Sequence, residues 1–232
     1  MSKTLIFTAT YNEKDNIRKL IEKLNKLNVD IDILVIDDNS PDKTWEILKE
    51  LEKNTSNLKV IVRNYKSGLD TAHKLAFDHA KNENYEKFIS MDADLSHDPD
   101  EIPKMINILD KFSFVIGSRY IKGGKCEMSG YRLLLSIIGN KFIKKILGLK
   151  CNEFTTSYRG FNLVKLENFN LNMIKSKGYS FFMETIYRLH KHGVNIYEIP
   201  IHFKNRRHGS SKIPGIEVFR TLKNLFILYL KK

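Results

Sequence analysis

FISMDADLSHDP, residues 88–99, is the segment of this 232-residue chain that indicates its fold class most clearly. Its first four residues are apolar or small and predict a strand over Phe88–Met91 that is buried on both faces. Two aspartates one residue apart, Asp92 and Asp94, follow directly, and Asp98–Pro99 is typical of the cap and first residue of a helix. A buried strand, an acidic loop and a helix in this order are typical of α/β proteins, whose ligands bind at the carboxyl ends of the strands.

The alternation of short apolar runs and helical patterns continues on both sides of this stretch. Four further apolar runs are predicted to be buried strands: Leu5–Thr8, Ile31–Ile36, Leu58–Val62 and Phe114–Ile116. Apolar residues recur at helical spacing between them and predict helices over 17–27, 69–80 and 102–109. Ser40 and Pro41 predict the cap and first residue of one more helix, which carries Trp45. We therefore expect an α/β fold with a mainly parallel central sheet flanked by helices.

The second half of the chain is less regular and contains amphipathic helices. Further elements are predicted as helices over 131–147, 181–192 and 216–230 and a strand over 196–203. From this pattern we expect one catalytic domain over residues 1–215. A C-terminal amphipathic helix over 216–232 is expected to pack on that domain or on a membrane surface.

Charge and composition narrow the class of protein. The 39 Lys and Arg residues against 27 Asp and Glu give a net charge of +12, and a basic protein attracts phosphates on nucleic acids, lipids or nucleotides. The basic residues are scattered, which disfavours a nucleic-acid-binding module with a basic and aromatic stripe. Two cysteines, Cys126 and Cys151, lie outside any CxxC spacing and predict neither a disulfide framework nor a zinc site. The chain also has no signal-peptide pattern and no apolar stretch near the roughly 20 residues that span a membrane, so a cytoplasmic location is expected.

Polar residues follow three of the predicted strands. Asp92 and Asp94 can point into one crevice and hold a hard divalent cation that bridges phosphate oxygens. The first two strands end in TATYNE (8–13) and VIDDNSPD (35–42). Taken singly, these residues are also typical of turns and helix caps. Together they predict a nucleotide site, with the base and ribose at the first two strand ends and the diphosphate with a metal at the fourth.

Eight short segments, in their order and spacing, carry a resemblance to a known family. They are ATYNE (9–13), DDNSPD (37–42), KSGL (66–69), MDADLSHDP (91–99), GSRYIKGG (117–124), SGYRLLLS (129–136), GYSFFMETIYR (178–188) and RRHGSSK (206–212). Together they resemble the family 2 glycosyltransferases with the GT-A fold, and among these the enzymes that act on dolichyl or polyprenyl phosphate. The resemblance covers nearly the whole chain.

The resemblance implies a role for each group of matching residues. The donor nucleotide would be bound by Ala9, Tyr11, Glu13, Asp37, Asp38, Lys66, Gly68 and Asp92. A divalent metal, Mg²⁺ or Mn²⁺, would be held by Asp92, Asp94 and Ser96. The acceptor phosphate would be bound by Arg119, Arg132 and Ser136. The catalytic residues would be Asp94, Arg119, Arg132, Arg206 and Lys212, of which the last two would neutralise charge on the leaving diphosphate.

The resemblance also implies the reaction. It would be an inverting transfer of mannose or glucose from GDP-mannose or UDP-glucose to polyprenyl or dolichyl phosphate. Because a phosphate acceptor is largely ionised near neutral pH, it needs positioning by arginines more than a carboxylate base. The amphipathic helices and their lysines suit shallow burial in an anionic leaflet. We expect a peripheral protein at the cytoplasmic face of a membrane, and a separate integral membrane partner is a further hypothesis.

Three other functions stay open. One is a family 2 enzyme that acts on a glycan or other hydroxyl acceptor, for which Glu184 and Asp70 are the candidate bases. The others are a non-catalytic basic binding protein and an inactive protein of the same fold. The intact acidic and basic motifs disfavour the inactive protein. The family usually has glycine where Ser157 stands, which predicts an altered turn beside the acceptor or a different sugar or acceptor.

Overall fold

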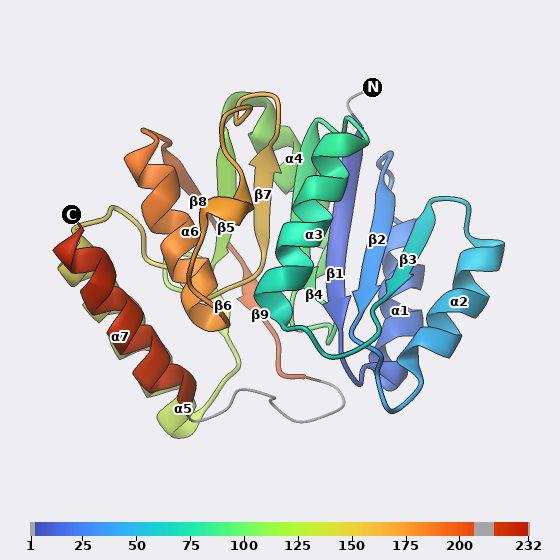
Figure 1. Cartoon of the computed structure of the whole chain (residues 1–232), viewed down its shortest axis with the longest axis horizontal. Coiled ribbons are helices and arrows are strands. Elements are labelled where there is room, and N and C mark those ends of the chain that lie inside the picture. The colour runs from blue at the N-terminus through green and yellow to red at the C-terminus, as the bar shows by residue number, and fades with distance from the viewer. Residues whose placement is uncertain (1–2, 207–215, 232) are drawn as a thin grey trace.

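A seven-stranded sheet forms the centre of the computed structural model, which describes residues 3–206 and 216–231. The spatial order of the strands is β3-β2-β1-β4-β7-β5-β8 (Figure 1). Their bounds are β1 Thr4–Thr10, β2 Asp32–Asp37, β3 Leu58–Val62, β4 Lys87–Asp92, β5 Phe114–Ser118, β7 Arg159–Asn162 and β8 Ile196–Pro200. Every neighbouring pair is parallel except those made by β7, which runs antiparallel to β4 and β5. The predicted mainly parallel sheet is confirmed, and β1 to β5 lie within two residues of their predicted bounds.

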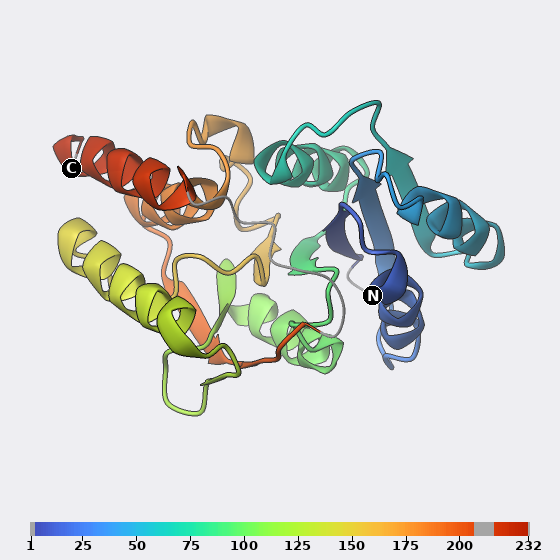
Figure 2. The same ribbon diagram turned by 90° about the horizontal axis from the view of Figure 1, so that it is seen from below.

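Helices cover both faces of this sheet (Figures 1 and 2). One face packs against α1 (Lys14–Asn25), α2 (Thr44–Asn54) and α4 (Ile102–Lys111). The other packs against α3 (Leu69–Asn82) and α6 (Tyr179–Lys191), with α5 (Gly130–Leu147) contributing at its edge. Helix α7 (Ile216–Leu230) packs against α5 and α6. The described chain also has a small parallel pair, β6 Lys125–Cys126 with β9 His202–Phe203, and two 3₁₀ turns, η1 Pro99–Glu101 and η2 Leu171–Met173.

The sheet is buried on both faces because side chains alternate along each strand. In β1, Leu5 and Phe7 join the hydrophobic cluster under α3 and α6, whereas Ile6 joins the cluster under α1 and α4. A strand with apolar partners on both sides needs a continuous apolar run, which is the pattern that the sequence shows. The packed strands therefore hold their carboxyl ends in fixed positions along one edge, which Figure 2 views from below.

Three predicted elements differ in their boundaries. Helix α1 spans Lys14–Asn25 rather than 17–27. Helix α2 begins at Thr44 rather than at Pro41, because residues 40–43 form a turn in which the N–H of Lys43 donates to the carbonyl of Ser40 at 3.0 Å. Lys43 itself has a φ of +63°, outside the helical region. The predicted strand over 196–203 is two strands, because at Ile201 the chain stops pairing with β5 and begins to pair with β6.

Strand β7 was not predicted, because its sequence, RGFN, has no apolar run. Its position in the sheet depends on Gly160. A Cβ atom there would lie 2.7 Å from Cγ1 of Val115 and 2.9 Å from Cδ1 of Leu109, so any other residue would require these side chains to move. The antiparallel direction of β7 brings residues 153–158 to the same edge of the sheet as the aspartates that follow β4.

Candidate active site at the carboxyl edge of the sheet

Asp92 and Asp94 lie at the carboxyl end of β4, in different surroundings. The Asp92 side chain is 34% exposed, and its Oδ1 accepts a hydrogen bond from the Ser157 hydroxyl at 2.5 Å. The Asp94 side chain is buried, and its Oδ1 accepts hydrogen bonds from the N–H and hydroxyl of Ser96 at 3.0 and 2.5 Å. Its Oδ2 forms an ion pair with Nε of Arg206 at 2.6 Å. The structure thus brings Asp92, Asp94, Ser96 and Arg206 together.

His97 fixes the loop that carries both aspartates. Its Nδ1 accepts a hydrogen bond from the N–H of Asp92 at 3.0 Å, which places the ring proton on Nε2, 3.1 Å from Oγ1 of Thr156. The ring is buried between Tyr158 and Phe203. Burial lowers the pKa of His97 more than the neighbouring carboxylates raise it, so the imidazole is neutral near neutral pH.

Asp37, at the end of β2, is fully buried and joins two loops. Its Oδ2 accepts hydrogen bonds from the hydroxyls of Thr10 and Ser40, each at 2.6 Å. Oγ of Ser40 in turn accepts a hydrogen bond from the N–H of Asn12 at 3.0 Å. Asp37 therefore holds the loops after β1 and β2 against each other, and its direct contact with a nucleoside stays a prediction.

Asp38 organises the next loop along the chain. Its carboxylate forms an ion pair with Arg63, and its Oδ2 accepts hydrogen bonds from the N–H groups of Ser67 and Gly68, both at 3.1 Å. Gly68 has a φ of +98°, a conformation that favours glycine. The loop between β3 and α3, which carries Lys66 and Gly68, is thus held beside the end of β2.

Tyr11 and Lys66 meet across these loops. Nζ of Lys66 lies 3.9 Å from the centre of the Tyr11 ring, a cation–π contact between the loop after β1 and the loop after β3. Ala9 pairs with Asp92 across β1 and β4, and the N–H of Glu13 donates to Oγ1 of Thr44 at 2.9 Å. The predicted donor residues therefore come from adjacent strand ends, and their contact with a nucleotide stays a prediction.

Arg119 is held by a buried carboxylate. Its Nε and Nη2 donate to the two carboxylate oxygens of Glu153 at 2.7 and 2.8 Å, and Nη2 also donates to Oγ1 of Thr155 at 2.9 Å. The side chains of Arg119 and Glu153 are only 6% and 0% exposed. Burial raises the pKa of Glu153, but the charge of Arg119 and the hydrogen bonds from Arg119 and Thr155 together outweigh burial and hold that pKa below its usual value. The pair is a structural clamp, and an acceptor-phosphate role for Arg119 stays a prediction.

Arg132 and Ser136 lie one turn apart on α5, as predicted. Arg132 is exposed, whereas Oγ of Ser136 accepts a hydrogen bond from the hydroxyl of Tyr120 at 2.6 Å. Tyr120 directly follows Arg119, so this bond ties α5 to the loop after β5. Lys212 lies outside the described residues, and its predicted role is carried forward as a prediction.

The side chains at this edge suit a hard cation. Asp92 and Asp94 supply two carboxylates, and oxygen donors are the ligands that Mg²⁺ and Mn²⁺ prefer. Within residues 3–206 and 216–231 there is no group of three or more His, Cys, Asp or Glu side chains that could hold a metal. A two-carboxylate site fits a cation that takes its remaining ligands from phosphate oxygens and water, which is the usual case for Mg²⁺ with nucleotides.

The candidate bases for a hydroxyl acceptor are engaged elsewhere. Oε2 of Glu184 accepts hydrogen bonds from the N–H groups of Lys175 and Ser176, and its Oε1 pairs with Arg188 at 3.1 Å. Asp70 is buried, and its Oδ1 accepts a hydrogen bond from the N–H of Gly178 at 3.1 Å. Both carboxylates stabilise the start of α6 and the loop before it.

Of residues 153–159, which form one wall of this site, the sequence analysis singled out only Ser157, and it assigned none of them a contact. Arg159 is fully buried and donates to the carbonyls of Thr156, Phe182 and Phe154 at 2.8, 2.8 and 3.0 Å. Burial lowers the pKa of Arg159 to about 9. The signal that could have found this wall is the run TTSYR (155–159), since polar residues and an arginine beside buried aromatics need buried partners.

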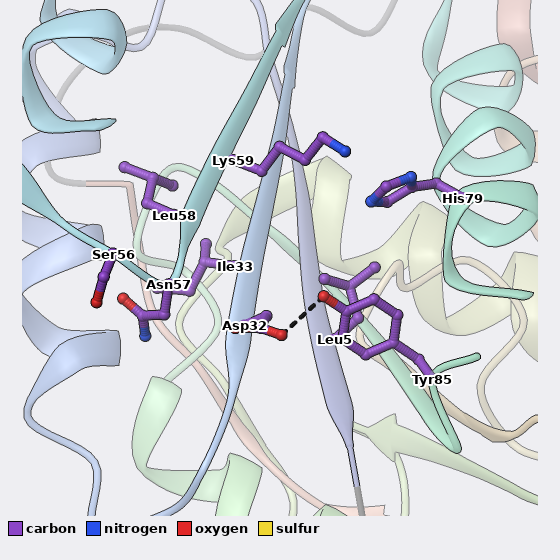
Figure 3. A pocket seen from close by; sticks show the side chains of 9 residues that line it. All are labelled: Leu5, Asp32, Ile33, Ser56, Asn57, Leu58, Lys59, His79 and Tyr85. Carbon is purple, nitrogen blue, oxygen red and sulfur yellow. Dashed lines mark hydrogen bonds between the residues drawn. The ribbon is translucent and has the colours of Figure 1, made fainter. Parts of the chain in front are cut away.

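A depression of about 240 Å³ lies at the opposite edge of the sheet (Figure 3). It is lined by the amino ends of β1, β2 and β3 together with His79 and Tyr85, whose hydroxyl donates to Oδ2 of Asp32 at 2.7 Å. Ligands of open α/β sheets bind at the carboxyl ends of the strands. This depression is therefore not the site described above.

Comparison with known proteins gives matches over most of the chain. The family model for glycosyl transferase family 2 matches residues 5–169. The chain is 33% identical over 219 residues to a polyprenol monophosphomannose synthase of Mycolicibacterium smegmatis, covering 93% of this chain and 83% of the relative. It is 32% identical over 214 residues to an undecaprenyl-phosphate mannosyltransferase of Micrococcus luteus, covering 92% of this chain and 88% of that relative.

The fold also matches a solved structure. Glucosyl-3-phosphoglycerate synthase from Mycobacterium tuberculosis, in complex with Mg²⁺ and uridine diphosphate, superimposes with a TM-score of 0.66 at 14% identity. The match covers 99% of this chain and 79% of the synthase. At this identity the match shows the fold alone, and it confirms the predicted GT-A type of α/β architecture.

Proposed function

The chain belongs to glycosyl transferase family 2, and on that premise we propose that it transfers a sugar from a nucleoside diphosphate sugar to a polyprenyl phosphate at a membrane surface. The observation that carries the proposal is the cluster of Asp92, Asp94 and Arg206 at the carboxyl end of β4. GDP-mannose and UDP-glucose are the candidate donors, and mannose is favoured because the two relatives named above carry mannose in their names.

Donor binding would use the adjacent ends of β1, β2 and β4. The loops fixed by Asp37 and Asp38 would hold the nucleoside beside Tyr11 and Lys66. A divalent cation, Mg²⁺ or Mn²⁺, held by Asp92 and Asp94 would neutralise charge on the diphosphate. Supporting examples are structures of the synthase above, which hold uridine diphosphate with Mg²⁺ or Mn²⁺.

Arg206 would act on the leaving group. Its guanidinium lies 2.6 Å from Asp94, the carboxylate proposed to meet the cation. From this position Arg206 would stabilise the charge that develops on the diphosphate as the bond to the anomeric carbon breaks. Lys212, six residues later, would add a second positive charge. Displacement by the acceptor from the opposite side inverts the anomeric configuration.

Arg132 and Ser136 would position the acceptor phosphate. The phosphate is already ionised, so its oxygen can attack the anomeric carbon without a carboxylate base. The structural hydrogen bonds of Glu184 and Asp70 support this acceptor over a hydroxyl, which needs such a base. A family 2 enzyme acting on a glycan hydroxyl remains the second candidate that the test below addresses.

The membrane proposal rests on α5 and α7. Large apolar side chains are exposed along both helices: Tyr131, Leu134, Leu135, Ile138, Phe142, Val218, Phe219, Leu222, Phe226, Ile227, Tyr229 and Leu230. Lys141 and Lys145 are exposed among them, an arrangement that suits a shallow position in an anionic leaflet. Among the described helices, none is long and apolar enough to cross a bilayer. We propose peripheral binding at the cytoplasmic face, with residues 216–232 as a membrane-contacting element added to the catalytic unit of residues 1–215.

The test is transfer of radiolabelled sugar into an organic-extractable lipid. Purified protein is incubated with vesicles containing polyprenyl phosphate and with labelled GDP-mannose or UDP-glucose, in Mn²⁺ or in EDTA. Cation-dependent label in the lipid phase from one donor would support the proposal and identify that donor. Donor turnover without label in the lipid phase would contradict the acceptor assignment and favour a water-soluble hydroxyl acceptor.

A further inference from the structure

Ser157 contacts the exposed aspartate of the site directly. Its hydroxyl donates to Oδ1 of Asp92 at 2.5 Å, and its side chain is almost fully buried. Its own carbonyl accepts a hydrogen bond from the hydroxyl of Ser90 at 2.6 Å, in a buried position. Ser157 is therefore fixed on one side by β4 and presents its hydroxyl on the other side to Asp92.

The strand register explains why these residues meet. In the antiparallel pair β4 and β7, Ser90 faces Arg159, so two residues further along the chain Asp92 faces Ser157. Hydrogen bonds on either side keep the two segments together: Nε2 of His97 donates to Oγ1 of Thr156 at 3.1 Å, and the hydroxyl of Tyr158 donates to the carbonyl of Asp98 at 2.8 Å. The segment 156–158 thus holds the acidic loop over its length rather than at one point.

We infer that Ser157 is a positioning residue that fixes the Asp92 carboxylate for cation binding, an inference that rests on the cation site of the proposed function. An ionised carboxylate has about four lone-pair positions, so one hydrogen bond from Ser157 leaves Asp92 able to bind a cation. The bond restricts rotation of a side chain that is otherwise partly exposed. Residues that orient a metal ligand in this way typically change metal affinity by 10- to 100-fold when they are replaced.

Direct measurement of Mn²⁺ binding tests the inference without relying on turnover. Free Mn²⁺ is followed by electron paramagnetic resonance while wild-type protein, Ser157→Ala and Asp94→Asn are titrated in the presence of uridine or guanosine diphosphate. Ser157→Thr keeps the hydroxyl, and Ser180→Ala removes another buried serine hydroxyl, which faces Thr221 instead. Melting temperatures of all variants show whether each is folded, and Ser157→Gly replaces Ser157→Ala if the latter does not fold.

We expect Ser157→Ala to weaken Mn²⁺ binding about 10-fold or more, Ser157→Thr to restore most of it, and Ser180→Ala to leave it unchanged. Equal Mn²⁺ affinity in wild type and a folded Ser157→Ala or Ser157→Gly variant would overturn the inference and leave the proposed function intact. Mn²⁺ binding that does not depend on Asp94 would overturn the cation site itself and the role of Ser157 with it.

Discussion

Replacing Glu153 with glutamine should destabilise the protein by several kcal/mol. The Glu153 side chain is fully buried and makes two charge-assisted hydrogen bonds, at 2.7 and 2.8 Å, with a guanidinium that is itself only 6% exposed. Glu153→Gln keeps the shape but leaves the Arg119 charge buried without its counter-charge. Removing one partner of a buried ion pair costs about 3–5 kcal/mol. For a domain of this size that corresponds to a fall in melting temperature of roughly 6–20 °C.

The assay is urea unfolding followed by far-ultraviolet circular dichroism at pH 7. Glu50→Gln is the matched control, because Glu50 pairs with Arg18 at 3.3 Å with both side chains largely exposed. An exposed pair contributes about 0–1 kcal/mol, so this control should unfold close to wild type.

A Glu153→Gln variant within about 1 kcal/mol of wild type would refute this reasoning. It would mean that the Arg119 charge is solvated or paired differently, and the guanidinium would then be available to an acceptor phosphate. A large loss of stability would instead support Arg119 as a clamp between the loop after β5 and the segment before β7.

Three further predictions concern the pH dependence of stability, the binding of the acceptor and the binding of the protein to membranes. Burial, with added repulsion from Arg159, lowers the pKa of His73 to about 3, so the unfolded chain binds a proton below pH 6.5 that the folded chain does not. The free energy of unfolding should therefore fall as pH drops from 6.5 to 5. The variant His73→Phe keeps an aromatic ring beside Phe7 and Phe182, and it should reduce the slope of unfolding free energy against pH by about 1.4 kcal/mol per pH unit. An unchanged slope in chemical denaturation would contradict a neutral His73 in the folded protein. In steady-state kinetics, Arg132→Ala should raise the acceptor concentration needed for half-maximal rate on the order of 10- to 100-fold and leave donor binding unchanged. Loss of donor binding instead would assign Arg132 to the donor site. Phe226→Glu should weaken binding to anionic vesicles about 10-fold or more in a sedimentation assay. The control Val164→Glu, at an exposed valine outside α5 and α7, should leave vesicle binding unchanged. Equal binding of both variants would contradict membrane contact through α5 and α7.

Much of the fold could be predicted because β1 to β5 are continuous apolar runs. A strand buried on both faces must be apolar throughout, so the local sequence reports its position in the sheet. The acidic loop after β4 was predictable for the same reason, since the strand that precedes it is unambiguous. The bounds of α3 to α6 also lie within two residues of those predicted, and α7 has the predicted bounds.

The contacts made by the wall of the site could not be predicted, because they are set by partners distant in the sequence. Strand β7 fits between β4 and β5 only because Gly160 allows close packing, a requirement that no local pattern expresses. The structure pairs Arg119 with Glu153, 34 residues away, a contact that the local sequence around either residue does not indicate. Ser157 was predicted to mark an altered turn, and the structure shows its hydroxyl on Asp92.

The most direct test of the central claim is mass spectrometry of the lipid extract after wild-type protein and Asp94→Asn are incubated with GDP-mannose or UDP-glucose, Mn²⁺ and vesicles that contain polyprenyl phosphate. The wild-type protein should produce a lipid heavier than the polyprenyl phosphate by one hexosyl residue, and Asp94→Asn should produce none. An equal yield from Asp94→Asn would contradict the carboxylate cluster at the end of β4 as the catalytic centre. Failure of the folded wild-type protein to produce that lipid from either donor would contradict the proposed reaction.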